Sequence, residues 1–233
     1  MSEFEDRGNA LLEVFDRWGD PEAWGERFTK DLADRSPSER LVFFEGNPQA
    51  DVVILHEQPS YQDVMTGRSF RDPAHKEIFE EMLDFAGARP RDVFFGPIFP
   101  FLLRSPEDGA TRSSTATEGR VALDYLADTI NIVDPKVIIV LGGKPYNLLR
   151  ANKTVSYARA AKNMHQARLK VLLPGKFMSV PRDAFVSYDF DYLKNKLDYA
   201  KGGPLHQAAQ TWLKAFAYVD TLYDLLDRED NDE

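Results

Sequence analysis

The 233-residue sequence contains no cysteine. This absence excludes disulfides, thiolate metal sites and iron–sulfur clusters held by cysteine. Only four histidines are present, scattered along the chain, and they predict no structural zinc site. The sequence also lacks an apolar run of about 18 residues, so we predict no membrane span. The acidic first residues contain no apolar signal core. We therefore expect a cytoplasmic protein, and the sequence implies no metal or cofactor.

Acidic side chains are absent from residues 135–182, although the chain has a formal net charge of −9. Residues 1–50 and residues 219–233 each hold six more acidic than basic side chains. The basic stretch predicts an anion-binding face, with phosphates of single- or double-stranded DNA, or of RNA, as the first candidates. The alternative is a solvated surface that the acidic ends balance. The basic residues of the stretch are Lys136, Lys144, Arg150, Lys153, Arg159, Lys162, Arg168, Lys170, Lys176 and Arg182.

Short apolar segments bounded by turn residues alternate with helical patterns from residue 51 onward. We expect strands at 51–55, at "RDVFF" ending near Phe95, at "KVIIVL" and at "ARLKVLLPGK". This order predicts a three-layer α/β/α fold around a central four-stranded, mainly parallel sheet. We expect one domain over 1–233. It comprises a helical N-terminal extension (1–50), a core (51–185), and C-terminal helices with an acidic tail (186–233).

Polar or turn-forming segments follow each expected strand. They read "HEQPS", "GPIFPF", "LGGK" and "SVPRD". Ligands of open α/β sheets bind beyond the carboxyl ends of the strands. Convergence of these segments at that edge predicts a functional site there.

Several segments, taken in order, resemble the uracil-DNA glycosylase superfamily. The likeness is closest to its iron–sulfur, thermostable-type branch, over roughly residues 51–185. That branch has Gly-Glu-Ala-Pro-Gly and then Gly-Arg-Pro-Phe where this chain has "HEQPS" and "TGRSF". "DPKVIIVLGGKPYNLL" is similar to the branch's later strand and helix. The four cluster cysteines are absent, and cluster-free branches of the superfamily exist.

The likeness also shows where this chain departs from the family pattern. The polar residue that usually follows the second strand falls near Gly96 or Pro97. The late histidine of the family's His-Pro-Ser type loop falls at Val180, within "VLLPGKFMSVPRDAF".

The resemblance implies an enzyme that flips uracil or a modified pyrimidine out of DNA and hydrolyses its bond to the sugar. It implies that Glu57 is the catalytic carboxylate, flanked by Gln58 and His56, and that Phe70 stacks on the base. Ser60 or Tyr61 would decide which pyrimidine substituents fit. Lys144 follows two glycines at a helix start, a position that attracts phosphate. Further phosphate contacts are expected from Lys176, Arg182, Arg104 and Arg112.

Each of these assignments has a structural alternative. Glu57 would be an exposed loop residue, His56 a strand end bonded to backbone, and Phe70 one of many core phenylalanines. For the whole chain, the alternatives are a nucleic-acid-binding protein that has lost the chemistry, or a protein-interaction module. In the latter, the acidic termini bind a basic protein partner.

Overall fold

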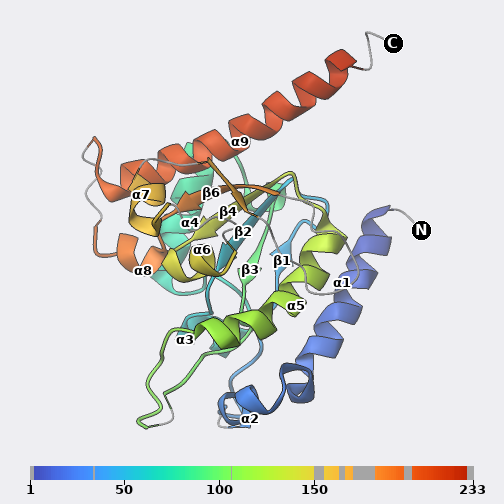
Figure 1. Cartoon of the computed structure of the whole chain (residues 1–233), viewed down its shortest axis with the longest axis vertical. Coiled ribbons are helices and arrows are strands. Elements are labelled where there is room, and N and C mark those ends of the chain that lie inside the picture. Colours follow the sequence, from blue (N-terminus) through green and yellow to red (C-terminus); the bar gives the residue numbers. More distant parts are fainter. Residues whose placement is uncertain are drawn as a thin grey trace.

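The computed structural model describes residues 3–33, 35–105, 107–149, 155–162, 166–169, 182–196 and 201–229. One six-stranded sheet lies between two layers of helices (Figure 1). The strands are β1 (Glu45–Gly46), β2 (Val52–His56), β3 (Val93–Pro97), β4 (Val137–Leu141), β5 (Gln166–Leu169) and β6 (Arg182–Ser187). The α-helices are α1 (Glu3–Gly19), α2 (Glu26–Ala33), α3 (Tyr61–Thr66), α4 (Pro73–Phe85), α5 (Ala116–Val133), α6 (Gly143–Leu149), α7 (Tyr157–Lys162), α8 (Phe190–Leu193) and α9 (Pro204–Glu229). Two 3₁₀ turns are η1 (Pro21–Trp24) and η2 (Pro90–Asp92).

The strand order is β1-β3-β2-β4-β6-β5. The four central strands, β3, β2, β4 and β6, are parallel, which confirms the expected α/β fold with its four-stranded parallel centre. The short β1 and β5 pair antiparallel at the two edges of the sheet. The sequence patterns predicted neither β1 nor the antiparallel pairing of β5. In register, Leu55 of β2 lies beside Gly96 of β3 and Val140 of β4.

Alternating side chains of the central strands fill two separate cores. Val53 and Leu55 pack on the face covered by α1, α5 and α6. Val52 and Ile54 pack on the opposite face, beneath α4 and α9. Because both faces are buried, the strands are continuously apolar, as is typical of parallel sheets. This two-sided burial is why "VVIL" and "VIIV" were recognisable as strands.

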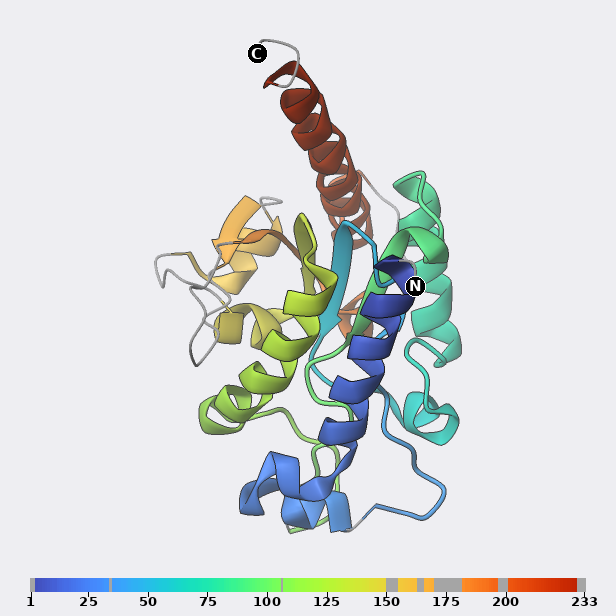
Figure 2. The same ribbon diagram turned by 90° about the vertical axis from the view of Figure 1, so that its right-hand side faces the viewer.

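The terminal helices belong to the two layers that cover the sheet. α1 lies along α5, and Arg7 of α1 donates to the carbonyl of Val133 (2.7 Å). α9 packs on α4 and on β6, then continues beyond the sheet, as Figure 2 shows. Tyr223 near its far end donates a hydrogen bond to the Asp51 carboxylate (3.0 Å). In the part of the chain that the structure describes, no helix combines the length and hydropathy needed to cross a bilayer.

The last parallel strand is not where the sequence placed it. The described part of "ARLKVLLPGK" lies in the antiparallel edge strand β5, whereas the fourth parallel strand, β6, begins in residues that we expected in a loop. β6 begins with the charged pair Arg182-Asp183, so its sequence does not look like a buried strand. Its centre, Ala184, Phe185 and Val186, is nevertheless buried. Tyr218 of α9 offsets the charge by donating to Asp183 (2.8 Å).

Strand β3 runs two residues further than expected, through Gly96 and Pro97. Ile98 donates its backbone N–H to His56 of β2 (2.8 Å). Since N–H groups alternate sides along a strand, the nitrogen of Pro97 faces the β1 side. β1 pairs only with Phe94 and Phe95, so the missing N–H of Pro97 leaves no ladder bond unmade.

The N-terminal helices should be essential to stability because Trp24 is 1% exposed and packs on Phe28, Phe101 and Tyr125. Trp24→Ala should lower the free energy of unfolding by about 3–5 kcal/mol, the usual cost of an aromatic cavity. Leu12→Ala, at a residue 65% exposed on α1, should change it by less than about 0.5 kcal/mol. Urea denaturation would measure both. Equal effects of the two substitutions would contradict the importance assigned to Trp24. Two unfolding transitions in the wild type would contradict the prediction of one domain.

Candidate active site

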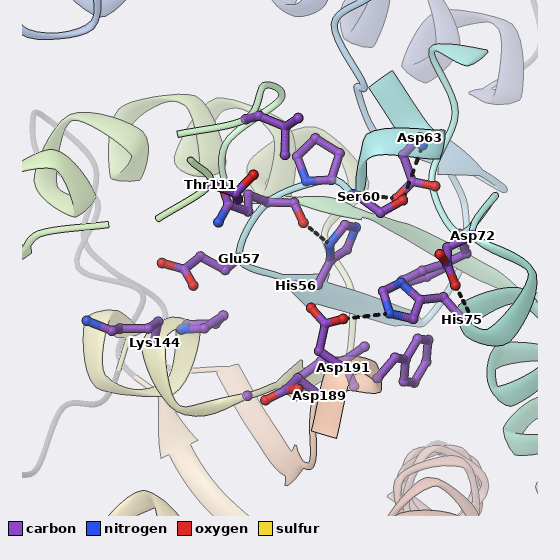
Figure 3. Close-up of a pocket in the computed structure, with 18 of the residues that line it drawn as sticks. His56, Glu57, Ser60, Asp63, Asp72, His75, Thr111, Lys144, Asp189 and Asp191 are labelled. Atoms are coloured by element: carbon purple, nitrogen blue, oxygen red, sulfur yellow. Dashed lines mark hydrogen bonds and ion pairs between the residues drawn. The ribbon is translucent and has the colours of Figure 1, made fainter. Parts of the chain in front are cut away.

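A pocket of about 490 Å³ lies at the carboxyl edge of the parallel sheet (Figure 3). Its walls come from the segments that follow β2, β4 and β6, together with α3, α4 and the loop 98–115. This is the edge at which open α/β sheets bind ligands. The pocket-lining residues used below are His56, Glu57, Gln58, Ser60, Tyr61, Asp63, Phe70, Asp72, His75, Lys144, Asp189, Asp191 and Lys194.

The turn from β2 into α3 is fixed by a capping box. Ser60 accepts a hydrogen bond from the Asp63 amide (3.2 Å), and Asp63 accepts one from the Ser60 amide (2.8 Å). Ser60 therefore serves as the N-cap of α3. Tyr61, the first residue of α3, is 59% exposed at the pocket wall. The structure places both residues at the pocket; a role for either in base selection stays a prediction.

Phe70 is buried at the inner end of the pocket. Its ring lies 4.7 Å from Phe79, 5.0 Å from Phe190 and 4.8 Å from His56, centroid to centroid. Its backbone has φ +53°, which is rare for a bulky side chain and costs conformational energy. Gly67, with φ +72°, ends α3 and turns the chain toward this position. Phe70 is thus a core residue, 4% exposed and also stacked on Phe95 at 5.5 Å, that contributes to the pocket lining; the stacking of a base on its ring stays a prediction.

His56 ends β2 with its imidazole against Phe70. Burial lowers the pKa of His56 to about 4, so the ring is neutral at pH 7. Nδ1 lies 3.0 Å from the Gln58 carbonyl, which can only accept, so the proton sits on Nδ1. Nε2 is then an acceptor, and it is buried with no partner among the described residues. This geometry agrees with the alternative of a strand-end histidine bonded to backbone.

Glu57 points into the pocket from the residue after β2. One carboxylate oxygen accepts hydrogen bonds from both the backbone amide and the hydroxyl of Ser114, each at 2.7 Å. Lys144, at the start of α6, donates to the Ser114 carbonyl (3.4 Å). The sequence analysis did not identify Ser114, which lies 57 positions from Glu57. These contacts show that Glu57 is held in one orientation and is not a freely solvated loop residue.

Gln58 ties the loop 98–115 to the end of β2. Its amide nitrogen donates to the Arg112 carbonyl (2.8 Å), and its amide oxygen accepts from the Leu103 amide (2.9 Å). Both polar atoms of the side chain therefore have structural partners. Gln58 fixes the segment that carries Ser114 and so acts on Glu57 indirectly.

Arg104 and Arg112 are paired with carboxylates of this chain. Arg112 makes a two-pronged contact with Glu118 (2.7 and 2.9 Å), and Arg104 contacts Glu39 (2.6 Å). Burial alone would raise the pKa of Glu118, but hydrogen bonds from Arg112 and Thr115 hold it at about 2. In the structure, both arginines hold the loop in place through these ion pairs. The phosphate contacts expected from them stay predictions.

The loop after β6 consists of Tyr188 and Asp189 followed by α8. Val180, at which the sequence analysis placed the family's late histidine, lies outside the described residues. Figure 3 shows Asp189 and Asp191 on the pocket floor, with Asp191 directed toward His75. His75 Nε2 lies 3.1 Å from Asp191, and Lys194 also donates to this carboxylate. The sequence analysis missed Asp189, Asp191 and His75.

Gly96, one of the two positions near which the sequence analysis placed the family's polar residue, has no room for a side chain. A Cβ atom at this position would lie 2.7 Å from the Phe44 ring and 2.8 Å from its Cα. Gly96 is also the penultimate residue of β3, so it lies within the strand and not in the loop that follows. The chain therefore supplies no polar group from this position.

The remaining predicted phosphate contacts are Lys144, Lys176 and Arg182. Lys144 lines the pocket. Lys176 lies outside the described residues. Arg182 begins β6, so its backbone lies at the amino end of a parallel strand, on the sheet edge opposite the pocket. This contradicts its expected place in a loop at the carboxyl edge.

Comparison with known proteins agrees with this architecture. The model of the uracil DNA glycosylase superfamily matches residues 43–200, which include β2, β4, β6 and every pocket-lining residue named above. The type-4 uracil-DNA glycosylase of Thermotoga maritima is 28% identical over 123 residues, which are 53% of this chain. The matched part spans 61% of that relative. With no cysteine, this chain lacks the thiolates with which the thermostable-type branch holds its cluster. From the order of its strands, the place of its pocket and the extent of the family match, the chain belongs to the uracil DNA glycosylase superfamily.

Proposed function

We propose that this protein is a DNA N-glycosylase that releases uracil or a modified pyrimidine from DNA. The observation that carries the proposal is Glu57, held by two hydrogen bonds from Ser114 inside the pocket of a superfamily member. A fixed carboxylate beside the sugar is the group that this hydrolysis needs, since the sugar acquires positive charge as the bond breaks.

In the proposed reaction, the bond between C1′ of the deoxyribose and N1 of the base breaks, and its electron pair leaves with the base. A water oxygen bonds to C1′, and the proton lost by the water balances the charge of the departing base. The Glu57 carboxylate orients that water and offsets the charge on the sugar. Phe70 supplies an aromatic surface against which the flipped base stacks.

Removing the charge of Glu57 should abolish most of the base release. Glu57→Gln keeps the shape and can still accept from Ser114, but it neither offsets the sugar's charge nor takes up a proton. We expect base release to fall by about 10²- to 10⁴-fold, measured as abasic sites in labelled oligonucleotides. DNA affinity should change less than threefold.

The matched control for this substitution is Glu77→Gln, at an exposed residue of α4 outside the pocket, and it should leave both quantities unchanged. Full activity of Glu57→Gln would remove Glu57 from the mechanism.

Ser114 should act as a positioning residue through Glu57. Ser114→Ala removes one of the two bonds to the carboxylate, and we expect base release to fall by about 10- to 100-fold. Ser114→Thr, which keeps the hydroxyl, should restore most of it. The double variant Glu57→Gln/Ser114→Ala should be no slower than Glu57→Gln alone. Fully additive losses would show that Ser114 acts independently of Glu57.

Lys144 should contribute one phosphate contact. Lys144→Ala should weaken DNA binding and reduce the slope of log affinity against log salt by about 0.7–0.9, because one counterion fewer is released. Lys214→Ala, at an exposed residue of α9 outside the pocket, is the control and should leave the slope unchanged. Fluorescence anisotropy at several salt concentrations measures both. An unchanged slope for Lys144→Ala would show that Lys144 makes no phosphate contact.

A nucleic-acid-binding protein without catalysis is the second candidate. Two features of the sequence favour it: no polar side chain stands at Gly96 or Pro97, and Val180 stands where the resemblance places the family's late histidine. Salt-sensitive DNA binding with no release of any base would establish this candidate. The absence of any DNA affinity would favour the protein-interaction module, whose basic partner stays a prediction.

A further inference from the structure

Carboxylates outnumber cations around the pocket. Five carboxylates and two lysines line it among the described residues. One lysine, Lys194, donates to Asp191, and the other, Lys144, donates to the carbonyl of Ser114. His56 is neutral because burial lowers its pKa to about 4. The lining carboxylates are Glu57, Asp63, Asp72, Asp189 and Asp191.

The five carboxylates differ in what holds them. Asp72 caps α4 and accepts from the Ala74 and His75 amides, while Asp63, in the first turn of α3, accepts from the Ser60 and Arg71 amides. Asp189 accepts from the Tyr192 amide (2.7 Å), and Asp191, whose side chain is 72% exposed, pairs with His75 at 3.1 Å. Contacts with His75 and Lys194 lower the pKa of Asp191, so it stays ionised. The pocket floor built by the loop after β6 is therefore rich in hydrogen-bond acceptors.

Such a floor disfavours a base that turns carbonyl oxygens toward it. Uracil presents the acceptors O2 and O4 on either side of its N3–H donor, so a carboxylate that faces either oxygen repels the base. An exocyclic amino group instead presents N–H donors, which carboxylates bind strongly. A site built to bind a donor discriminates strongly against analogues that lack it.

We propose that the pocket takes a base that carries an exocyclic amino group, and that Asp189 and Asp191 determine this specificity. The proposal rests on the glycosylase function proposed above and names its substrate class. The amino group belongs either to the pyrimidine ring, as in cytosine, or to a substituent at C5.

The first test compares four DNA substrates that differ at one base: uracil, cytosine, 5-hydroxymethyluracil and 5-aminomethyluracil. Base release is measured as abasic sites, in single and double strands. Release of cytosine at least about tenfold faster than uracil supports a ring amino group. Release of 5-aminomethyluracil at least about tenfold faster than its neutral 5-hydroxymethyl counterpart supports a substituent amino group.

Two outcomes of this comparison overturn the specificity proposal. Uracil or 5-hydroxymethyluracil released as fast as the amino-bearing bases overturns it and leaves the glycosylase function intact. Release of none of the four bases overturns both proposals.

The second test removes the charges. Asp189→Asn and Asp191→Asn should each reduce the preference for the amino-bearing base by at least about tenfold. Asp84→Asn, at an exposed residue of α4 outside the pocket, should leave it unchanged. Thermal unfolding checks that each variant is folded.

Because Asp189 and Asp191 also hold α8, affinity provides an independent measurement. In a Glu57→Gln background, the amino-bearing substrate should bind more tightly than its matched counterpart. Equal affinities, together with an unchanged preference in both aspartate variants, would overturn the assignment of Asp189 and Asp191.

Discussion

Burial of both faces of the central strands is the constraint on which the rest of the structure depends. Val53 and Leu55 face one helical layer, while Val52 and Ile54 face the other. A shift of β2 by one residue would exchange the two sets, and only one register fills both cores. That register places Leu55 beside Gly96 and Val140. The loops that leave β2, β4 and β6 consequently meet at one edge, and the pocket follows from their meeting.

A second set of interactions orients the groups inside that pocket. Gln58 holds the loop 98–115 through both polar atoms of its amide. Arg112 anchors the same loop to Glu118 at the start of α5, and Ser114 then reaches Glu57. The chemistry proposed for one carboxylate therefore relies on a segment more than forty positions away in the chain. The same loop carries Arg104, whose ion pair with Glu39 also helps to hold it.

The sequence predicted the sheet where apolar patterning is strong and failed where charge interrupts it. "VVIL" and "VIIV" were recognisable, whereas β6 opens with Arg182-Asp183, whose charge Tyr218 of α9 partly compensates. Glu57 and Phe70 could be singled out because "HEQPS" and "TGRSF" resemble two motifs of the family. Ser114 and the pair of His75 with Asp191 could not, because 57 and 116 positions separate the partners. Such pairs become neighbours only through the tertiary fold, which local periodicity does not encode.

The close approach of Phe44 to Gly96 has a consequence for redesign. A single substitution at position 96 cannot introduce a polar side chain, because a new Cβ would collide with the Phe44 backbone at 2.8 Å as well as with its ring. Shortening Phe44 removes the ring but leaves that Cα in place. A designer who wants a polar side chain here must first rebuild the path of the chain through residues 43–46.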